Sequence, residues 1–327
     1  MTVPRRTGAG IVRYYSLLTA ATSFADDALS GLALQQKAIP PKYFYDERGS
    51  QLFTAICELP EYYLTRTEMA IMARHIDDVA RLLGPETQLI EFGSGPSVKT
   101  RLLVERLEPS LYVPIDIDES QLRSGCGELA SRFPWLNING VVADFTHPLQ
   151  LPEFIGVPIR RLAAYFPGST IGNFTPNEAV EFLRNVHRMV GSGGMLLIGV
   201  DTKKDKQVLD AAYDDSQGVT AAFNLNLLAR INRELRGDFQ PGRFRHKAFY
   251  NEALGRVEMH IESLYQQIVH VAGSRFEFKP SETIHTEISC KYTIEEFQAL
   301  ARRARFHAEV AWTDPGGLFA VHAMMAV

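Results

Sequence analysis

The stretch "TQLIEFGSGPSVKT", residues 87–100, decides the fold class. It reads as a short apolar strand, then a glycine turn, then the start of an amphipathic helix. The same alternation of strand and helix continues as far as Asp201. Short apolar strands separated by amphipathic helices are typical of a parallel, doubly wound sheet. We therefore predict an α/β core. The predicted strands cover 87–93, 110–117, 136–145, 160–169 and 193–201, and the predicted helices cover 97–108, 118–133 and 177–190.

The pattern changes after Asp201. Two helices are predicted first, the second ending at Gly237, and strands with antiparallel character follow them. The chain closes with a helix and a hairpin whose tip is "DPGG". We divide it into an N-terminal segment 1–70, a core 71–204, an inserted α+β region 205–290 and a C-terminal part 291–327 that completes the core.

Composition narrows the function classes. The 327 residues carry 34 Lys and Arg against 38 Asp and Glu, a formal charge of −4, which does not indicate nucleic acid or anionic membrane as a partner. Cys57, Cys126 and Cys290 are far apart and lack metal-ligand spacing, so we expect no metal site and a reduced, cytoplasmic setting. We see no signal peptide and no apolar run long enough to cross a bilayer. We expect a monomer.

The glycine turn admits three interpretations. A dinucleotide-binding turn needs three glycines, but Val98 occupies the third position and only Gly93 and Gly95 remain. A short turn after an acidic strand end suits a nucleoside without a pyrophosphate, such as S-adenosylmethionine. A tight turn without any ligand is the third interpretation.

The next two strands end in polar residues at the same edge. Asp116 and Asp118 follow one strand, and a carboxylate there could bind both hydroxyls of a ribose. Asp144 and Phe145 end the next strand, where an acid could accept from an adenine amino group while the ring packs on the base. Ligands of open α/β sheets bind at this edge. The pattern favours a methyltransferase over an NAD-linked dehydrogenase.

A late strand, "HTEISCKYT" at 285–293, has one polar face. Alternation places Glu287, Ser289 and Lys291 on the same side of this strand. Such a face is either exposed to solvent or part of a binding site, and the strand alone does not decide between them.

Six motifs resemble one family. They are "KYFYDERGSQLF" at 42–53, "LPEYYLTRTE" at 59–68, "GSTIGNF" at 168–174, "AYDDSQGVTAAFN" at 212–224, "RVEMHI" at 256–261 and "TEISCKY" at 286–292. The sequence resembles, from about residue 38 to its end, the histidine-specific S-adenosylmethionine-dependent methyltransferases, which make trimethylhistidine (hercynine), a precursor of ergothioneine. The resemblance implies a class I methyltransferase sheet with a second α+β domain, formed by the N-terminal segment and the insertion, that binds the substrate.

The resemblance also implies roles for single residues. The residues that would surround the cofactor are Tyr45, Gly93, Lys99, Asp116, Asp144 and Phe145. The residues that would contact L-histidine are Tyr62, Gly168, Thr170, Asn173, Tyr213, Met259, Glu287 and Ser289. Within these sets, Tyr62, Asn173 and Tyr213 would hold the α-amino and carboxylate groups. Met259, Glu287 and Ser289 would contact the imidazole.

Methyl transfer from a sulfonium mainly requires alignment of the nucleophile with the methyl group. The acceptor amine must be neutral, and the dipoles of Asn173 and Tyr62 suit this better than a carboxylate. Together with Tyr45 these residues form the predicted catalytic group, because tyrosine faces can also stabilise the growing cation. Without the resemblance, core packing is the better explanation of both Tyr45 and Tyr62. Two alternatives stay open, namely methylation of another aromatic amino acid or amine and a non-catalytic amino-acid sensor.

Overall fold

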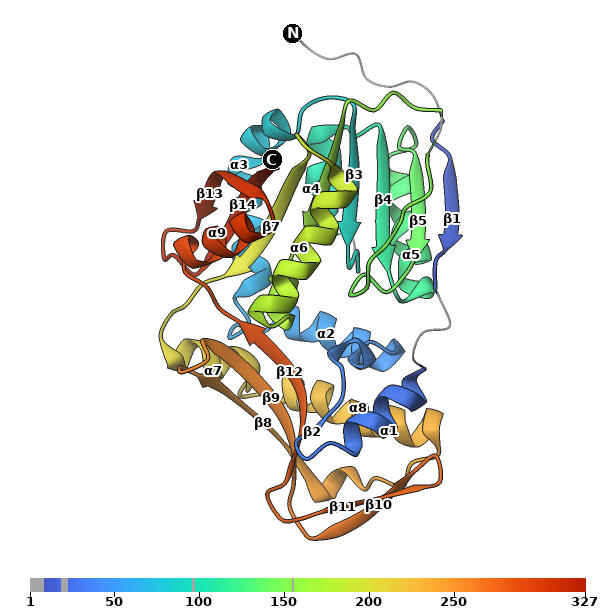
Figure 1. Cartoon of the computed structure of the whole chain (residues 1–327), viewed down its shortest axis with the longest axis vertical. Coiled ribbons are helices and arrows are strands. Elements are labelled where there is room, and N and C mark those ends of the chain that lie inside the picture. The colour runs from blue at the N-terminus through green and yellow to red at the C-terminus, as the bar shows by residue number, and fades with distance from the viewer. Residues whose placement is uncertain (1–8, 19–22, 96–97, 155) are drawn as a thin grey trace.

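The computed structural model describes residues 9–18, 23–95, 98–154 and 156–327. Its larger part is an eight-stranded sheet with the order β1-β5-β4-β3-β6-β7-β14-β13 (Figure 1). The strands are β1 (Val12–Ser16), β3 (Thr87–Phe92), β4 (Leu111–Asp116), β5 (Ile138–Val142), β6 (Arg161–Phe166), β7 (Met195–Asp201), β13 (Phe306–Thr313) and β14 (Phe319–Ala326). Strands β1 to β7 of this sheet pair in parallel, whereas β14 is antiparallel to both its neighbours. The predicted α/β core is confirmed.

Helices cover both faces of the large sheet. Successive residues of the fully buried strand β3 supply both sides, since Leu89 packs in one apolar cluster and Ile90 in the other. Helices α3 (Leu64–Leu83), α4 (Val98–Leu107) and α5 (Glu119–Arg132) lie on one face, and α6 (Pro176–Val190) and α9 (Ile294–Arg303) lie on the other (Figure 1). A parallel sheet buried on both faces explains why its strands read as nearly continuous apolar runs.

Capping residues in the sequence determine where most of the predicted helices begin and end. Gly84 ends α3 with a φ of 79°, a conformation that favours glycine. Thr175 and Glu178 form a capping box before α6, with Pro176 as the first helical residue. The prediction for Gly237 was wrong. Helix α8 (Val219–Leu235) instead ends at Arg236, which adopts the left-handed conformation itself with a φ of 53°.

A second sheet with the order β2-β12-β9-β8 lies beyond the carboxyl ends of β3, β4 and β5 (Figure 1). Its strands are β2 (Lys37–Ala38), β8 (Phe244–Asn251), β9 (Arg256–Ser263) and β12 (Thr283–Cys290). A hairpin of β10 (Gln267–Val271) and β11 (Ser274–Phe278) forms a separate two-stranded sheet. Helices α1 (Phe24–Leu32), α2 (Glu47–Cys57), α7 (Lys206–Tyr213) and α8 accompany this sheet, together with the 3₁₀ helices η1 (Pro41–Phe44) and η3 (Pro241–Arg243). Because β2 pairs with β12, the N-terminal segment and the insertion form one α+β unit.

The first strand corrects one prediction. The whole segment 1–70 was assigned to the substrate-binding part, but β1 extends the large sheet by pairing with β5 from Val12 to Ser16. Alternating side chains give β1 an inward face, on which Val12 and Tyr14 pack against the apolar core. The other boundaries of the domain division stay predictions. Pro96 and Ser97 of the glycine turn, and residues 1–8 of the N-terminus, lie outside the described residues.

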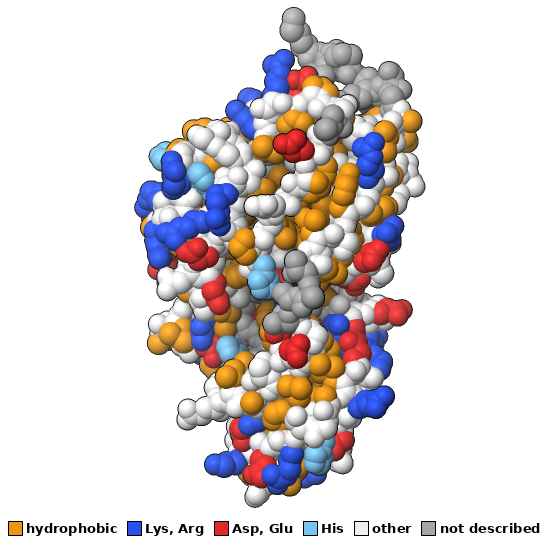
Figure 2. Space-filling view, turned by 45° about the vertical axis from the view of Figure 1, so that its right-hand side comes forward, with side chains coloured by type: hydrophobic (Ala, Val, Ile, Leu, Met, Phe, Trp, Pro, Cys, Tyr) orange, Lys and Arg blue, Asp and Glu red, His pale blue; other side chains and the backbone are white. Residues whose placement is uncertain are grey.

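Among the described residues, no helix is both long enough and apolar enough to cross a membrane. Figure 2 shows one side of the molecule, where basic and acidic side chains are mixed around the rim and apolar side chains occupy the middle. Both signs of charge therefore appear on this side, in keeping with the formal charge of −4.

Candidate active site

The carboxyl edge of the large sheet holds the groups predicted from the strand ends. The term "carboxyl edge" refers below to Gly93, Gly95, Asp116, Asp144 and Phe145. Gly93 has a φ of 68°, and a Cβ atom there would lie 3.7 Å from the Phe145 ring. The backbone can therefore approach a ligand beside an aromatic face.

Asp116 and Asp118 take different positions. Asp116 ends β4 half-buried, and its carboxylate accepts from the N–H groups of Gly95 at 3.2 Å and Asp118 at 3.0 Å. Burial raises the pKa of Asp116, although these N–H donors lower it part of the way back. Asp118 caps helix α5 by accepting from Ser120 and Gln121. Asp116 is thus the carboxylate that is available to a ribose, and Asp118 serves the helix.

Asp144 already has protein partners. Its carboxylate accepts from Thr146 and from the Lys42 ammonium at 3.1 Å. Burial alone would raise the pKa of Asp144, but Thr146 and Lys42 outweigh it and the pKa is lowered. Lys42 belongs to η1, so this ion pair joins the N-terminal segment to the carboxyl edge.

Lys99 follows the glycine turn and reaches toward the loop after β6. Its ammonium lies 2.5 Å from the buried carboxylate of Glu68, which also accepts from the N–H of Gly168 at 2.9 and 3.1 Å. Gly168 has a φ of 78°. The three residues connect helices α3 and α4 to this loop, which lines the pocket described next.

A pocket lies between the two sheets. It is lined by Tyr45, Phe53, Ile56, Tyr62, Gly168, Ser169, Thr170, Asn173, Ala212, Tyr213, Thr220, Phe223, Met259, Glu287 and Ser289. The structure thus brings together all eight residues predicted to contact the substrate, and Tyr45 with them. Tyr45 is close enough to both Glu287 and Asp116 for their charges to raise the pKa of its hydroxyl further, after the larger effect of burial. It therefore lies between the pocket and the carboxyl edge.

Asn173 is positioned by a short turn. It ends the 3₁₀ helix η2 (Thr170–Asn173), directly before the capping box of α6. This turn packs closely on strand β12, because a Cβ at Gly172 would lie 2.9 Å from the carbonyl oxygen of Cys290 and 3.2 Å from the Ser289 hydroxyl. A glycine is required at that approach, and it brings Asn173 to the same pocket as Ser289.

The polar face of β12 points into the pocket and not into solvent. Glu287 pairs with Met259 of β9, after a register shift between His285 and Glu287. Burial raises the pKa of Glu287 to about 7, and the charge of Lys291 lowers it part of the way back. Ser289 is buried. The solvent-exposed alternative is therefore wrong, and the interpretation of this face as a binding site stays a prediction.

A charged group that the sequence did not reveal lies under the pocket. We call it the Lys291 network, comprising Lys291, Asp201, Lys204, Tyr63, Tyr213 and Ser289. Asp201 is fully buried and lies 2.7 Å from the Lys291 ammonium and 2.5 Å from that of Lys204. It also accepts from Tyr63 at 2.8 Å. Burial lowers the pKa of Lys204 to about 8, although Asp201 acts in the opposite direction.

Other pocket residues were also missed. Phe53 and Phe223 contribute apolar walls, and Phe223 has ring contacts with Tyr45 and Phe53. An aromatic residue on an amphipathic helix is indistinguishable from core packing in a single sequence. Asp201 offered one signal, since an acid that directly follows an apolar strand at the carboxyl end of a parallel sheet is a candidate site residue.

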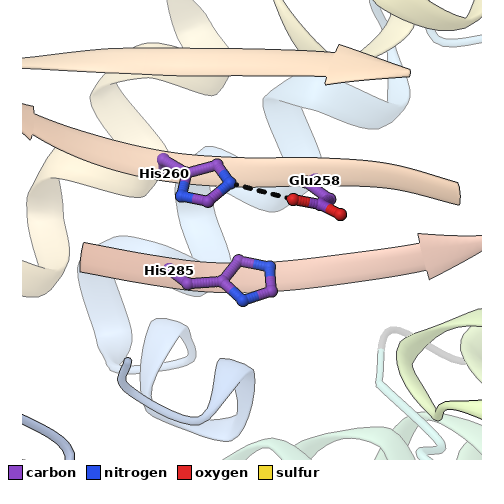
Figure 3. A group of neighbouring side chains, drawn as sticks. All are labelled: Glu258, His260 and His285. Atoms are coloured by element: carbon purple, nitrogen blue, oxygen red, sulfur yellow. Dashed lines mark hydrogen bonds and ion pairs between the residues drawn. The ribbon is translucent and has the colours of Figure 1, made fainter. Parts of the chain in front are cut away.

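Glu258, His260 and His285 form a separate cluster on the opposite face of the small sheet (Figure 3). Their potential ligand atoms lie within 4.8 Å of one another. The two rings are stacked, with centroids 4.7 Å apart at 16°, while a metal ion binds a ring nitrogen in the plane of the ring. Stacked rings cannot direct nitrogens at one ion, and Glu258 instead accepts from Arg256 and pairs with His260. The expected lack of a metal stays a prediction.

The sequence matches one family of known proteins over most of its length. Residues 24–326 match the model of the family described as histidine-specific methyltransferase, SAM-dependent. Over 94% of this chain and 97% of the relative, the sequence is 39% identical to histidine N-alpha-methyltransferase of Mycolicibacterium smegmatis. It is 40% identical to the protein of that name from Mycobacterium tuberculosis, over 90% and 92% of the two chains. It is 30% identical to ergothioneine biosynthesis protein 1 of Schizosaccharomyces pombe, over 84% of this chain and 37% of the longer relative.

The family match covers most of the chain, and the relatives from the two bacteria align over nearly their whole length. The two sheets and the pocket between them all fall within the matched residues. The chain therefore belongs to the family of histidine-specific, S-adenosylmethionine-dependent methyltransferases.

Proposed function

We propose that this protein transfers methyl groups from S-adenosylmethionine to the α-amino nitrogen of L-histidine and yields trimethylhistidine. One observation carries the proposal. Glu287, Ser289 and Met259 lie in the same pocket as Asn173, Tyr62 and Tyr213. The first three suit an imidazole ring, because they offer a carboxylate, a hydroxyl and an apolar side chain. Asn173 and Tyr62 suit the polar groups on an α-carbon, and Tyr213, which donates its hydrogen to Ser289, keeps a lone pair for an α-amino N–H.

The carboxyl edge fits the nucleoside part of the cofactor. Gly93 offers an open backbone beside the Phe145 ring, and the half-buried carboxylate of Asp116 suits a pair of hydroxyls. Asp144 and Lys99 border the same region with their own ion pairs. When bound, S-adenosylmethionine supplies a methyl group on a positively charged sulfur. Tyr45, between the edge and the pocket, would lie near the reacting nitrogen.

The residues of the pocket suit a neutral amine. Asn173 and Tyr62 present dipoles and no negative charge, so they give an ammonium no special advantage over the amine. Burial raises the pKa values of Tyr45 and Tyr62 well above the ordinary tyrosine value, so both remain neutral hydroxyls. Neither tyrosine can therefore hold the released proton as a base. Their ring faces remain available to the methylated cation, at up to about 2 kcal/mol each when desolvated.

Incubation of the purified protein with L-histidine and S-adenosylmethionine tests the proposal. Mass spectrometry should detect mono-, di- and trimethylated histidine over time, and fragmentation should place every methyl group on the α-nitrogen. Methyl groups on a ring nitrogen would refute the proposal. So would a preparation that methylates another amine but leaves histidine unmodified.

A further inference from the structure

A buried ammonium lies directly behind the polar end of the pocket. The side chain of Lys291 has no exposed surface, and its Nζ donates to the Ser289 hydroxyl at 2.9 Å and to the Tyr213 hydroxyl at 2.9 Å. The third contact is the ion pair with Asp201 at 2.7 Å. These three partners match the three donors of an ammonium group.

These bonds fix the direction in which Ser289 can act. A hydroxyl has one hydrogen to donate and two lone pairs to accept with. The Ser289 oxygen accepts from Lys291 at 2.9 Å and from the Tyr213 hydroxyl at 2.8 Å. With the Tyr213 hydroxyl as the donor of this pair, both acceptor positions of Ser289 are used, and its hydrogen is left for a ligand in the pocket. Ser289 is thereby a donor to the ligand and not an acceptor.

Charge balance at this end of the pocket also favours a neutral imidazole ring over an imidazolium. Two ammonium groups, Lys291 and Lys204, face the carboxylate of Asp201 and, at a pH above its pKa of about 7, the carboxylate of Glu287. Burial alone would lower the pKa of Lys291, but Asp201 and Tyr213 raise it overall, so the ammonium stays charged. A neutral ring leaves the four charges balanced, whereas an imidazolium adds an uncompensated positive charge in a buried place.

We propose that Lys291 is a positioning residue that makes Ser289 a hydrogen-bond donor, so that the pocket selects the neutral imidazole of histidine in a single tautomer. Glu287 accepts from the ring N–H, and Ser289 donates to the bare ring nitrogen. This inference rests on the proposed function, because it takes histidine as the ligand and these two residues as its ring contacts.

The direct test is nitrogen NMR of ring-¹⁵N-labelled histidine bound to the protein with S-adenosylhomocysteine, which prevents turnover. With the unchanged protein, we expect one protonated and one bare ring nitrogen at a pH above the pKa of about 7 of Glu287. In K291M the Ser289 oxygen is free to accept, and one positive charge is lost. We expect the bound ring to carry protons on both nitrogens there, with the KM for histidine raised about 10- to 100-fold.

K204M is the matched control. Like K291M, it removes one of the two ammonium groups that contact Asp201, so either variant leaves Asp201 one lysine partner. K204M removes no contact to Ser289, so the single-tautomer signal should persist. S289A keeps the buried charge and removes only the donor. It should leave the ring neutral, mix the two tautomers and weaken histidine binding about tenfold. This variant also keeps the inference testable if K291M does not fold.

The outcomes separate the two proposals. Failure of the unchanged protein to bind histidine would refute the proposed function itself. Histidine bound by K291M as the same neutral tautomer with an unchanged KM would overturn only the role of Lys291. An unaltered tautomer and affinity in S289A would also overturn it, because the donor would then be irrelevant.

Discussion

At the carboxyl edge, the groups expected to bind the cofactor lie in turns that directly follow three neighbouring strands. Gly93, Asp116 and Asp144 each come within two residues of a strand end. In the pocket, by contrast, the lining residues come from segments between Tyr45 and Ser289, and the Lys291 network, with the fully buried pair of Lys291 and Asp201, lies beneath them. The edge is thus built by local chain geometry, whereas the pocket depends on long-range packing and on buried charge.

The largest expected effect is a difference in the free energy of unfolding between a variant of the Lys291 network and a variant of the carboxyl edge. D201N would remove the one carboxylate that pairs directly with the ammonium groups of both Lys291 and Lys204. Breaking a buried ion pair in this way costs about 3–5 kcal/mol in the free energy of unfolding. D144N, at the carboxyl edge, breaks a partly exposed pair with Lys42 and should cost less than about 1 kcal/mol. Urea unfolding of both variants checks the difference, and equal losses would contradict it.

Binding should separate the regions as well. E287A is expected to raise the KM for histidine about 10- to 100-fold, because a hydrogen bond to a charged group is lost, with little change in cofactor affinity. D116A should do the reverse, since it removes a carboxylate from the carboxyl edge. Calorimetric titration with S-adenosylhomocysteine and steady-state kinetics measure the two effects. A cofactor defect in E287A would show that the division is wrong.

The pKa of Glu287 predicts a pH effect. At about 7 this carboxyl protonates as the pH falls through neutrality, and a protonated Glu287 is no longer a pure acceptor. Productive binding then requires the loss of one proton from Glu287, in addition to those lost from histidine. Below about pH 6, log(kcat/KM) should therefore fall by one unit more per pH unit in the unchanged protein than in E287Q. Parallel acid limbs would refute this.

The smallest expected effect concerns Tyr45, which lies between the regions. Y45F removes a neutral hydroxyl but keeps the ring, so histidine binding should change little. The balance among mono-, di- and trimethylated products should change, because the hydroxyl is placed near the nitrogen as it becomes bulkier. Product distributions at equal turnover provide the measurement. An identical distribution would remove Tyr45 from the reacting end of the pocket.

The same comparison explains what the sequence could predict. The parallel sheet, the glycine turn and Asp116 follow from apolar runs and strand ends, which are local patterns. The site residues of the pocket, such as Asn173 and Met259, entered only through resemblance to a family. Residue patterns alone left Glu287 and Ser289 undecided between solvent and a site.

Lys291 and Lys204 were beyond prediction. A lysine in a single sequence normally indicates an exposed position, because burying an ammonium is costly without a partner. The partner, Asp201, is 90 residues from Lys291 in the chain. The assignment of β1 failed for a similar reason, since its pairing with β5 spans more than 120 residues. Long-range partners leave no trace in a single sequence.

The central claim is that the pocket beside the small sheet selects the side chain of the methyl acceptor. The most direct measurement is a competition in which the purified protein and S-adenosylmethionine act on an equimolar mixture of L-histidine, phenylalanine, tyrosine and tryptophan. Mass spectrometry should find methyl groups on the α-nitrogen of histidine alone. Comparable methylation of any of the other three amino acids would contradict the claim.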